Sequence, residues 1–307
     1  MGELGTRRRR SSDAVNARRL LIGLSAAWLG LFLLWPLAIV LRIALAEPRI
    51  AQPPYSPLLE RGADGGWQIL LGFQNFALLF EEPLYLEAWA NAIGLAGAAS
   101  LLCLLLAYPM AAAIAACRPA LRRLLLALII LPFWTSFLLR VYAFIGLLGP
   151  HGHLNQLLLY FGLIDEPLAI LHTPRAVLIG MVYTYLPFML MPIYASLEKR
   201  DPVLLEAARD LGASPLQTFL KVTLPLSTPG IQAGILLVFV PALGEFVIPD
   251  LLGGPGTPMI GHVLWTEFFA NRAWPVAAAL AVSLLLASLA VFLALKRLTR
   301  GADTRQP

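Results

Sequence analysis

Residues 201–217 read DPVLLEAARDLGASPLQ and lie between two long apolar runs. Asp201 is a favourable N-cap, and Pro202 suits the first turn of a helix because its missing N–H would be unpaired there in any case. Gly212 suits the position just beyond a helix C-terminus, where a left-handed backbone is common. The spacing therefore predicts a short helix whose apolar and small side chains would let another protein's backbone approach closely.

A second helix start follows directly. Ser214 and Gln217 have the spacing of a capping box. Pro225 is expected to block the continuation of this helix, because proline removes a hydrogen-bond donor and clashes with the preceding turn. The stretch thus predicts two short amphipathic helices at a sharp angle on a membrane face.

Apolar sequence dominates the rest of the chain. Of its 307 residues, 59% are hydrophobic and 13% are charged, and the mean hydropathy is +0.75. A soluble domain has about 45–50% apolar and about 25% charged residues, and disordered chains are poor in apolar residues. The composition excludes a soluble enzyme and a disordered protein, and it predicts an integral membrane protein of several spans.

Six runs are long enough to cross a bilayer core of about 30 Å, which needs roughly 20 apolar residues. They are Leu20–Leu41, Ala88–Cys117, Leu124–Pro150 (interrupted only by Arg140), Ala176–Leu197, Val222–Gly244 and Ala273–Leu295. The uncharged stretch Leu251–Thr266 is interrupted by glycines and prolines, which predicts a loop or a re-entrant element rather than a seventh span. The predicted fold is an all-α membrane protein with six transmembrane helices.

The distribution of positive charge predicts the orientation. Seventeen Lys and Arg side chains flank one side of the six runs and four flank the other. The positive-inside rule places the richer side, with both termini, in the cytoplasm. The net charge of +5 is explained by these flanks, so lipid and not nucleic acid is the expected contact. A cleaved signal peptide is disfavoured because the first run has 22 residues, against about 7–15 in a signal peptide.

The loop between the fourth and fifth runs resembles a known family signature. Its residues are Glu206-Ala207-Ala208-Arg209-Asp210-Leu211-Gly212-Ala213, followed by Phe219, Val222 and Leu224-Pro225. This pattern resembles the EAA loop of ABC-importer permeases, in which a coupling helix docks into a groove of the ATPase subunit. The resemblance implies a type I ABC importer permease fold. It also implies that the residues in contact with the ATPase include Glu206, Ala207, Ala208, Asp210, Gly212, Ala213 and Pro225.

Further segments are similar to polyamine-importer permeases. They are residues 131–137 (LPFWTSF), 140–142 (RVY), 171–173 (LHT), 241–249 (PALGEFVIP) and 251–255 (LLGGP). This similarity extends over roughly residues 90 to 296 and is closest to the putrescine-type permease. It implies a permease subunit of the bacterial inner membrane that moves putrescine or spermidine by alternating access. The implied partners are a second homologous permease, two ATPase copies and an extracytoplasmic solute-binding protein.

The chain itself is expected to perform no chemistry. It contains no G-x-x-x-x-G-K sequence, so ATP and magnesium are expected on the separate ATPase and no cofactor on this chain. His151 and His153 lack a third ligand at a suitable spacing, so no metal site is predicted. No arrangement of side chains suggests a catalytic nucleophile.

The predicted organisation has five parts. They are a basic cytoplasmic tail (1–19), a first transmembrane helix (20–46), an extracytoplasmic segment (47–87), a permease core of five helices (88–296) with a coupling loop (201–225), and a cytoplasmic tail (297–307). The extracytoplasmic segment contains six acidic residues against two arginines, which suits a cationic solute or partner.

Ionisable side chains within a span are functional candidates. Glu245 is expected in the outer half of the fifth helix, with Asp250 at its outer mouth, where carboxylates would bind an ammonium group. Aromatic faces for an alkylammonium are offered by Trp134, Tyr142 and Tyr185. The alternative is a structural ion pair between Glu245 and Arg140, and the sequence leaves both roles open.

Two other functions remain possible at this stage. The coupling loop is shared by ABC importers of other solutes, such as iron, thiamine or an organic anion. An ion-coupled secondary transporter is the more distant alternative, since such proteins often show inverted repeats and no self-similar halves are recognisable here.

Overall fold

The computed structural model describes residues 19–20, 22–57, 59–61, 67–69, 71–254 and 256–303. In chain order, its elements are the π-helix η1 (Gly30–Leu34), α2 (Trp35–Ala44), β1 (Leu59–Arg61), β2 (Trp67–Ile69), α3 (Gln74–Glu81), α4 (Pro83–Ala116), α5 (Pro119–Ile130), the 3₁₀ turn η2 (Leu131–Trp134), α6 (Phe137–Leu148), α7 (His153–Tyr160), α8 (Pro174–Glu198), α9 (Pro202–Asp210), α10 (Pro215–Thr218), the π-helix η3 (Phe219–Thr223), α11 (Leu224–Leu243), α12 (Val247–Leu252), α13 (Ile260–Phe269) and α14 (Trp274–Asp303). The chain forms two compact units, residues 1–77 with 272–282 and residues 78–271 with 283–307.

Five helices in the described part of the chain are long and apolar enough to cross a membrane. They are Ile22–Ala44, Pro83–Ala116, Pro174–Glu198, Pro215–Leu243 and Trp274–Arg297. A sixth crossing is present only if the bent pair Pro119–Trp134 and Phe137–Tyr160 counts as one span. The membrane part is therefore all-helical, as predicted, whereas the expectation of one continuous third span over Leu124–Pro150 is wrong.

The third span breaks at a turn whose local chemistry explains the bend. The two segments meet at an angle of 92°. Pro132 opens the 3₁₀ turn, and Thr135, which has an extended backbone, donates its hydroxyl to the Pro132 carbonyl at 2.7 Å. This hydroxyl and the Thr135 N–H both pair with the Pro132 carbonyl, so both polar groups of Thr135 that donate are satisfied where the chain leaves the helix.

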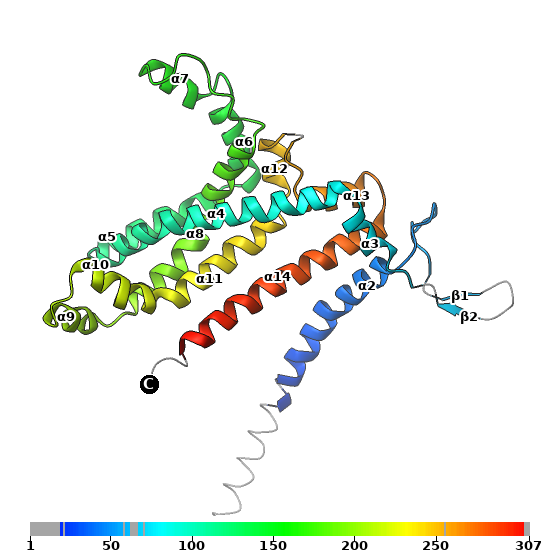
Figure 1. The fold of residues 1–307 in the computed structure, drawn as a ribbon, viewed down its shortest axis with the longest axis horizontal. Coiled ribbons are helices and arrows are strands. Elements are labelled where there is room, and N and C mark those ends of the chain that lie inside the picture. The colour runs from blue at the N-terminus through cyan, green and yellow to red at the C-terminus, as the bar shows by residue number, and fades with distance from the viewer. Residues whose placement is uncertain are drawn as a thin grey trace, which may run out of the picture. The chain divides into compact units, whose positions relative to one another are not determined.

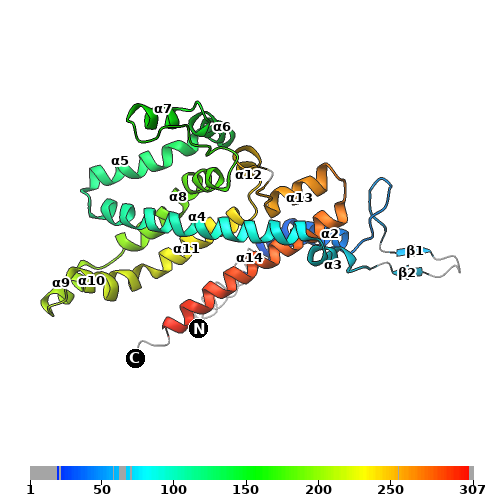
Figure 2. The same ribbon diagram turned by 45° about the horizontal axis from the view of Figure 1, so that its top comes forward.

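The larger unit is built around α4, α8 and α11, which lie side by side in both ribbon views (Figures 1 and 2). Small residues allow the close approach of these helices, as is common between membrane helices. A stripe of small, fully buried residues runs along α4: Ala88, Ala92, Ala96, Ala99, Cys103, Ala107 and Ala111. On α11, a Cβ at Gly230 would clash with Ser196 and Pro192 of α8, and one at Gly234 would lie 2.6 Å from the Met189 sulfur.

The fifth span starts earlier than predicted. The prediction that Pro225 blocks the second short helix is wrong, because residues 215–243 form one helical span. The π-helical turn η3 lies just before Pro225 and continues α10 into α11. A turn of this kind alters the local hydrogen-bond pattern, and Pro225 follows it directly as the second residue of α11.

The smaller unit contains an addition to the all-α prediction, a two-stranded antiparallel hairpin in which Glu60 of β1 pairs with Gln68 of β2. Arg49 donates to both Glu60 oxygens, at 3.0 and 2.6 Å. This ion pair lowers the pKa of the Glu60 carboxyl and raises the pKa of the Arg49 guanidinium. In the same unit, the buried Asn75 amide donates to the Ala44 and Ala46 carbonyls and so caps the first span.

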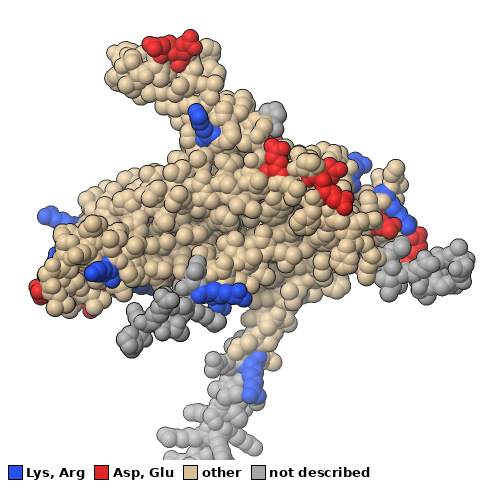
Figure 3. Space-filling view, viewed as in Figure 1, with Lys and Arg blue, Asp and Glu red and all other residues tan. Residues whose placement is uncertain are grey.

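In the larger unit, α9 and α10 lie at one end of the helix bundle and α12 and α13 at the other (Figure 1). In the space-filling view, the flank of the bundle shows few charged side chains over its length, and acidic side chains gather over the α12–α13 end (Figure 3). An uncharged flank is what a lipid-facing surface requires.

Candidate functional site: a coupling loop and an outer cavity

The first short helix of the loop and the start of the second form as the sequence predicts. The Asp201 carboxylate accepts the Val203 N–H at 3.0 Å and caps α9. Gly212 has a φ of 78°, a left-handed conformation that favours glycine. The Ala213 N–H donates to the Ala208 carbonyl at 3.0 Å, which closes the C-terminal turn of α9.

The second helix carries the predicted capping box. The Ser214 hydroxyl accepts the Gln217 N–H at 3.3 Å, and the Gln217 side chain accepts the Ser214 N–H at 3.0 Å. None of the residues of α9 is buried, and Leu211 is 89% exposed. The loop therefore presents an exposed apolar surface on a locally rigid frame. Of the predicted coupling residues, Glu206 and Ala207 are exposed, as are Asp210 and Gly212, whereas Ala208 and Ala213 are half-buried.

A hydrogen bond across the base of the loop was not predicted. The Arg200 guanidinium, which precedes α9, donates to the Thr223 hydroxyl, which follows α10, at 3.1 Å. Next to it, Arg122 forms an ion pair with Glu198 at 3.1 Å and donates to the Ala115 carbonyl at 2.8 Å. The two ends of the coupling loop are thus joined to each other, and the end of α8 is joined to the end of α4.

The sequence placed Glu245 in the outer half of the fifth helix. This prediction is wrong, because α11 ends at Leu243. Its Oε1 accepts the N–H groups of Val247 and Ile248 at 3.1 and 3.4 Å and so caps α12. Its Oε2 accepts the hydroxyl of the buried Tyr185 at 2.5 Å. The structure thus brings together two of the predicted path residues, Glu245 and Tyr185, at the break between α11 and α12.

The alternative role of Arg140, an ion pair with Glu245, is not observed. Among the described residues, Arg140 forms no ion pair, and its guanidinium lies over the rings of Phe133 and Phe137, at 5.0 and 5.9 Å from their centroids. Its Nε is buried and has no hydrogen-bond partner. Glu245 is held instead by Tyr185 and by the first turn of α12.

The remaining aromatic candidates are not gathered with Glu245. Trp134 is 84% exposed at the bend of the third span, and Tyr142 is exposed on α6. Both side chains lie on the surface of this chain, and their role in a solute path stays a prediction.

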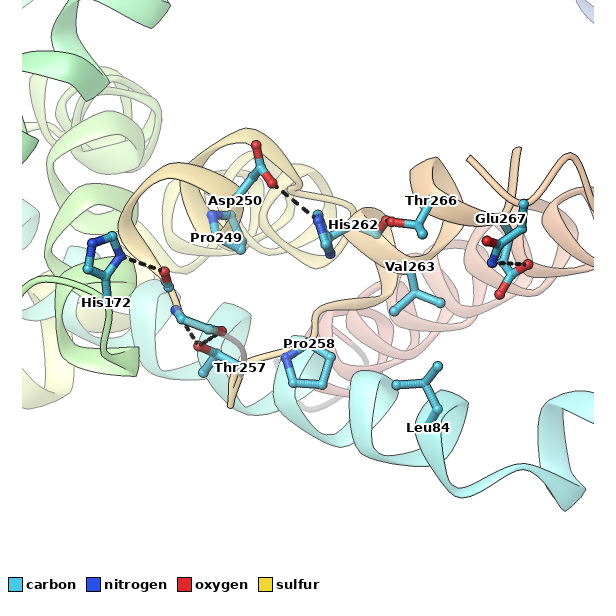
Figure 4. A pocket seen from close by; sticks show the side chains of 13 residues that line it. Leu84, His172, Pro249, Asp250, Thr257, Pro258, His262, Val263, Thr266 and Glu267 are labelled. Carbon is cyan, nitrogen blue, oxygen red and sulfur yellow. Dashed lines mark hydrogen bonds and ion pairs between the residues drawn. The ribbon is translucent and has the colours of Figure 1, made fainter. Parts of the chain in front are cut away.

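The α12–α13 end of the larger unit, which the charge distribution predicts to be the outer one, contains a cavity of about 440 Å³ between α4, α12 and α13. Asp250, the remaining predicted path residue, lines it and faces His262 of α13, with 3.2 Å between its Oδ1 and the His262 Nε2 (Figure 4). His172 also lines it and pairs with the Gly253 carbonyl at 3.2 Å. Within the described residues, no group of three or more His, Cys, Asp or Glu side chains is arranged to hold a metal ion.

Glu267 is the functional candidate that sequence reasoning missed. It lines the same cavity, further along α13 than His262 (Figure 4), and is 8% exposed. Its Oε1 accepts the Tyr85 hydroxyl of α4 at 3.1 Å, and its Oε2 accepts the Asn271 amide at 3.0 Å. An acidic residue beside two phenylalanines was the only local signal, because Tyr85 lies 182 residues away in the sequence.

Comparisons with known proteins agree with this architecture. Residues 104–303 match the family model described as "Binding-protein-dependent transport system inner membrane component". The "Spermidine/putrescine transport system permease protein PotB" of Escherichia coli K12 is 47% identical over 217 residues, which cover 71% of this chain and 78% of that protein. The protein of the same name from Haemophilus influenzae is 40% identical over 267 residues, covering 87% and 88%. These relatives correct the expectation of a putrescine-type permease, since their name gives both polyamines.

Solved structures support the fold. A bacterial ABC transporter involved in the import of the acidic polysaccharide alginate matches with a TM-score of 0.65 and 21% identity, covering 95% of this chain and 98% of that one. The alginate transporter in complex with an alginate-pentasaccharide-bound periplasmic protein matches with a TM-score of 0.69 and 19% identity, covering 96% and 97%.

Proposed function

Because the chain belongs to the family of binding-protein-dependent transport system inner membrane components, we propose that it is the permease subunit of an ATP-driven importer of polyamines. In this proposal, it forms the translocation path for spermidine or putrescine together with a second, homologous permease. The path opens alternately to the two sides of the membrane, and the chain itself catalyses no reaction.

The observation that carries the ATP-driven mechanism is the coupling loop. Its two capped helices and exposed apolar side chains form a preorganised docking surface for another protein. We assign this surface to the ATPase, of which two copies would bind ATP and magnesium, so that no cofactor is required on this chain. The contact residues proposed are those of the EAA pattern: Glu206, Ala207, Ala208, Asp210, Gly212, Ala213 and Pro225.

The remaining parts of the assembly follow from the same proposal. An extracytoplasmic binding protein would deliver the solute to the α12–α13 end, opposite the coupling loop. The chain would lie in a bacterial inner membrane with both termini in the cytoplasm, because the Lys and Arg residues are concentrated on that side of the six apolar runs.

Polyamine as the solute is supported by two features. The curated relatives at 40–47% identity carry spermidine and putrescine in their names. In addition, the outer cavity contains the carboxylates of Asp250 and Glu267, and carboxylates bind ammonium groups by charge-assisted hydrogen bonds.

A competition experiment tests the solute. The complete transporter is reconstituted in vesicles, and uptake of labelled spermidine is measured with a hundredfold excess of unlabelled putrescine, thiamine or ferric ion. We expect strong competition by putrescine and none by thiamine or ferric ion. Absence of spermidine uptake, with uptake of one of the other solutes instead, would assign the chain to an importer of that solute.

A further inference from the structure

Glu267 is an almost buried carboxylate with no cationic partner in the part of the chain that the structure describes. Its two hydrogen-bond donors, the Tyr85 hydroxyl and the Asn271 amide, are both neutral. Among the described residues, no lysine or arginine forms an ion pair with it. A buried carboxylate is normally paired, because removing its charge from water is costly.

The carboxylate also retains acceptor capacity towards the cavity. An ionised carboxylate has about four lone-pair sites, and the two donors within the protein occupy one on each oxygen. Glu267 lines the cavity wall, so a donor that enters the cavity can reach the free sites. The donor that best matches an uncompensated negative charge is a cation with several N–H groups, such as a primary ammonium.

A second acidic point lies within the same cavity. Asp250 is exposed and is held at one oxygen by His262. His262 and Glu267 are five residues apart on α13, a rise of about 7.5 Å at 1.5 Å per residue. The two acidic side chains therefore lie at different points along the wall of the same cavity. Between the two acidic points the wall is mixed, with His262, Val263 and Thr266 of α13 and Leu84 of α4 (Figure 4).

We propose that this outer cavity is a two-point site for a diamine, in which Glu267 binds one ammonium group and Asp250 the other. The methylene chain between them contacts the apolar part of the wall, Leu84 and Val263. Tyr85 and Asn271 act as positioning residues that fix the Glu267 carboxylate. The inference deepens the proposed function and rests on it, because it assigns polyamine entry to a particular pair of carboxylates.

The test uses Glu267→Gln in the complete reconstituted transporter. Glutamine keeps the shape and an acceptor for the Tyr85 hydroxyl but removes the charge. The matched control is Glu166→Gln, the same change at an exposed carboxylate after α7. Uptake of labelled putrescine is measured with the binding protein at saturating concentration, and ATPase activity is titrated with the solute-free binding protein in parallel.

The site predicts that Glu267→Gln lowers putrescine uptake about tenfold or more, the effect of losing one charge-assisted contact. Glu166→Gln leaves uptake unchanged, and the concentration of binding protein that half-stimulates the ATPase is the same in both variants and the wild type. Uptake at the wild-type rate in Glu267→Gln overturns the proposal. The proposal is also overturned if Glu267→Gln raises the concentration of binding protein that half-stimulates the ATPase but leaves uptake normal at saturating binding protein. That result would mean that Glu267 contacts a basic side chain of the binding protein.

A direct binding measurement separates this inference from the proposed function. The purified complete transporter is heated with putrescine, butylamine or butane-1,4-diol, and the unfolding temperature of the permease is recorded. If the cavity is a two-point diamine site, putrescine raises the unfolding temperature more than butylamine does, and the diol does not raise it. In Glu267→Gln, putrescine and butylamine raise the unfolding temperature equally. If the wild type takes up no polyamine, the proposed function fails, and this shift still decides whether the cavity binds a diamine.

Discussion

Glu245 connects three elements through one carboxylate. One oxygen caps α12, and the other accepts the hydroxyl of Tyr185 on α8, at a point where α11 has just ended. A capping carboxylate at a helix N-terminus is also favoured by the helix dipole. The residue therefore fixes the geometry of the break that leads to the outer cavity, whether or not the solute touches it.

The absence of an ion pair between Glu245 and Arg140 leads to a double-mutant prediction. Glu245→Gln keeps an acceptor for the cap but weakens the Tyr185 bond, and we expect it to cost about 1 kcal/mol of stability. Adding Arg140→Gln is expected to change the unfolding temperature additively, because the two groups share no partner. Unfolding of the purified single and double variants, monitored by temperature, measures the interaction. Restoration of stability by the second change would show that the two charges neutralise each other after all.

Hydrogen bonds between residues close in the chain could be predicted from the sequence, and those between distant residues could not. The caps at Asp201 and Ser214 were predictable because each depends on residues within three positions. The Tyr85–Glu267 and Tyr185–Glu245 hydrogen bonds connect residues 182 and 60 positions apart, and no periodic pattern encodes such pairs.

At the scale of elements, the positions of the membrane spans were predicted well because apolar composition determines them. The positions at which spans bend or continue were predicted poorly. Hydropathy identified the apolar runs because a span must satisfy its backbone internally. The bend at Thr135 and the π-turn before Pro225 depend on how proline's missing donor is accommodated. The Thr135 bend is closed by hydrogen bonds to the Pro132 carbonyl, and a π-turn precedes Pro225. Neither feature changes the hydropathy of its run, so the sequence indicated a break at Pro225 where the helix continues and none at Thr135 where the span bends.

The coupling surface of α9 yields a steric prediction. Ala207→Trp places a bulky ring on a surface where a partner is expected to approach closely, and overpacking of this kind costs about 1–3 kcal/mol. We expect uptake to fall about tenfold or more while the chain still inserts in the membrane. Co-purification of the ATPase and solute uptake are the two measurements.

The control for Ala207→Trp is Leu163→Trp, the same ring at an exposed position in the loop after α7. It is expected to leave uptake and ATPase binding unchanged. Normal uptake and intact ATPase binding in Ala207→Trp would remove the assignment of this face to the ATPase.

The hydrogen bond at the base of the loop yields a second prediction at this scale. Thr223→Val removes the acceptor for Arg200 at nearly constant volume, a loss of about 1 kcal/mol. If this bond makes the loop move as one body, solute transported per ATP falls several-fold while ATP hydrolysis continues. Thr228→Val is the matched control, because its hydroxyl bonds only within its own helix, to the Leu224 carbonyl. Equal transport per ATP in both variants would show that the bond has no part in coupling.

For the whole molecule, the orientation in the membrane is a prediction from charge alone. In a chain with Cys103 and Cys117 replaced by serine, single cysteines are introduced at Leu211 in the coupling loop and Ile50 in the outer segment, both of which are exposed. An impermeant maleimide added to intact cells should label Ile50→Cys and not Leu211→Cys, and it should label both after the membrane is opened. Labelling of Leu211→Cys in intact cells would reverse the orientation.

The whole molecule has its two candidate sites at opposite ends of one helix bundle, formed by α4, α8 and α11. The coupling loop follows α8 at one end, and α12 and α13 follow α11 at the other. The same three helices therefore connect the loop to the cavity. This arrangement is what an importer driven by a cytoplasmic ATPase requires.

The most direct test of this account is the energy source for polyamine uptake. Vesicles containing the complete transporter are prepared with ATP, with ADP, or with ADP and an imposed proton or sodium gradient, and labelled spermidine and its binding protein are added outside. The account predicts accumulation with ATP alone and none in the other two preparations. Accumulation driven by the ion gradient in the absence of ATP would contradict it and identify a secondary transporter.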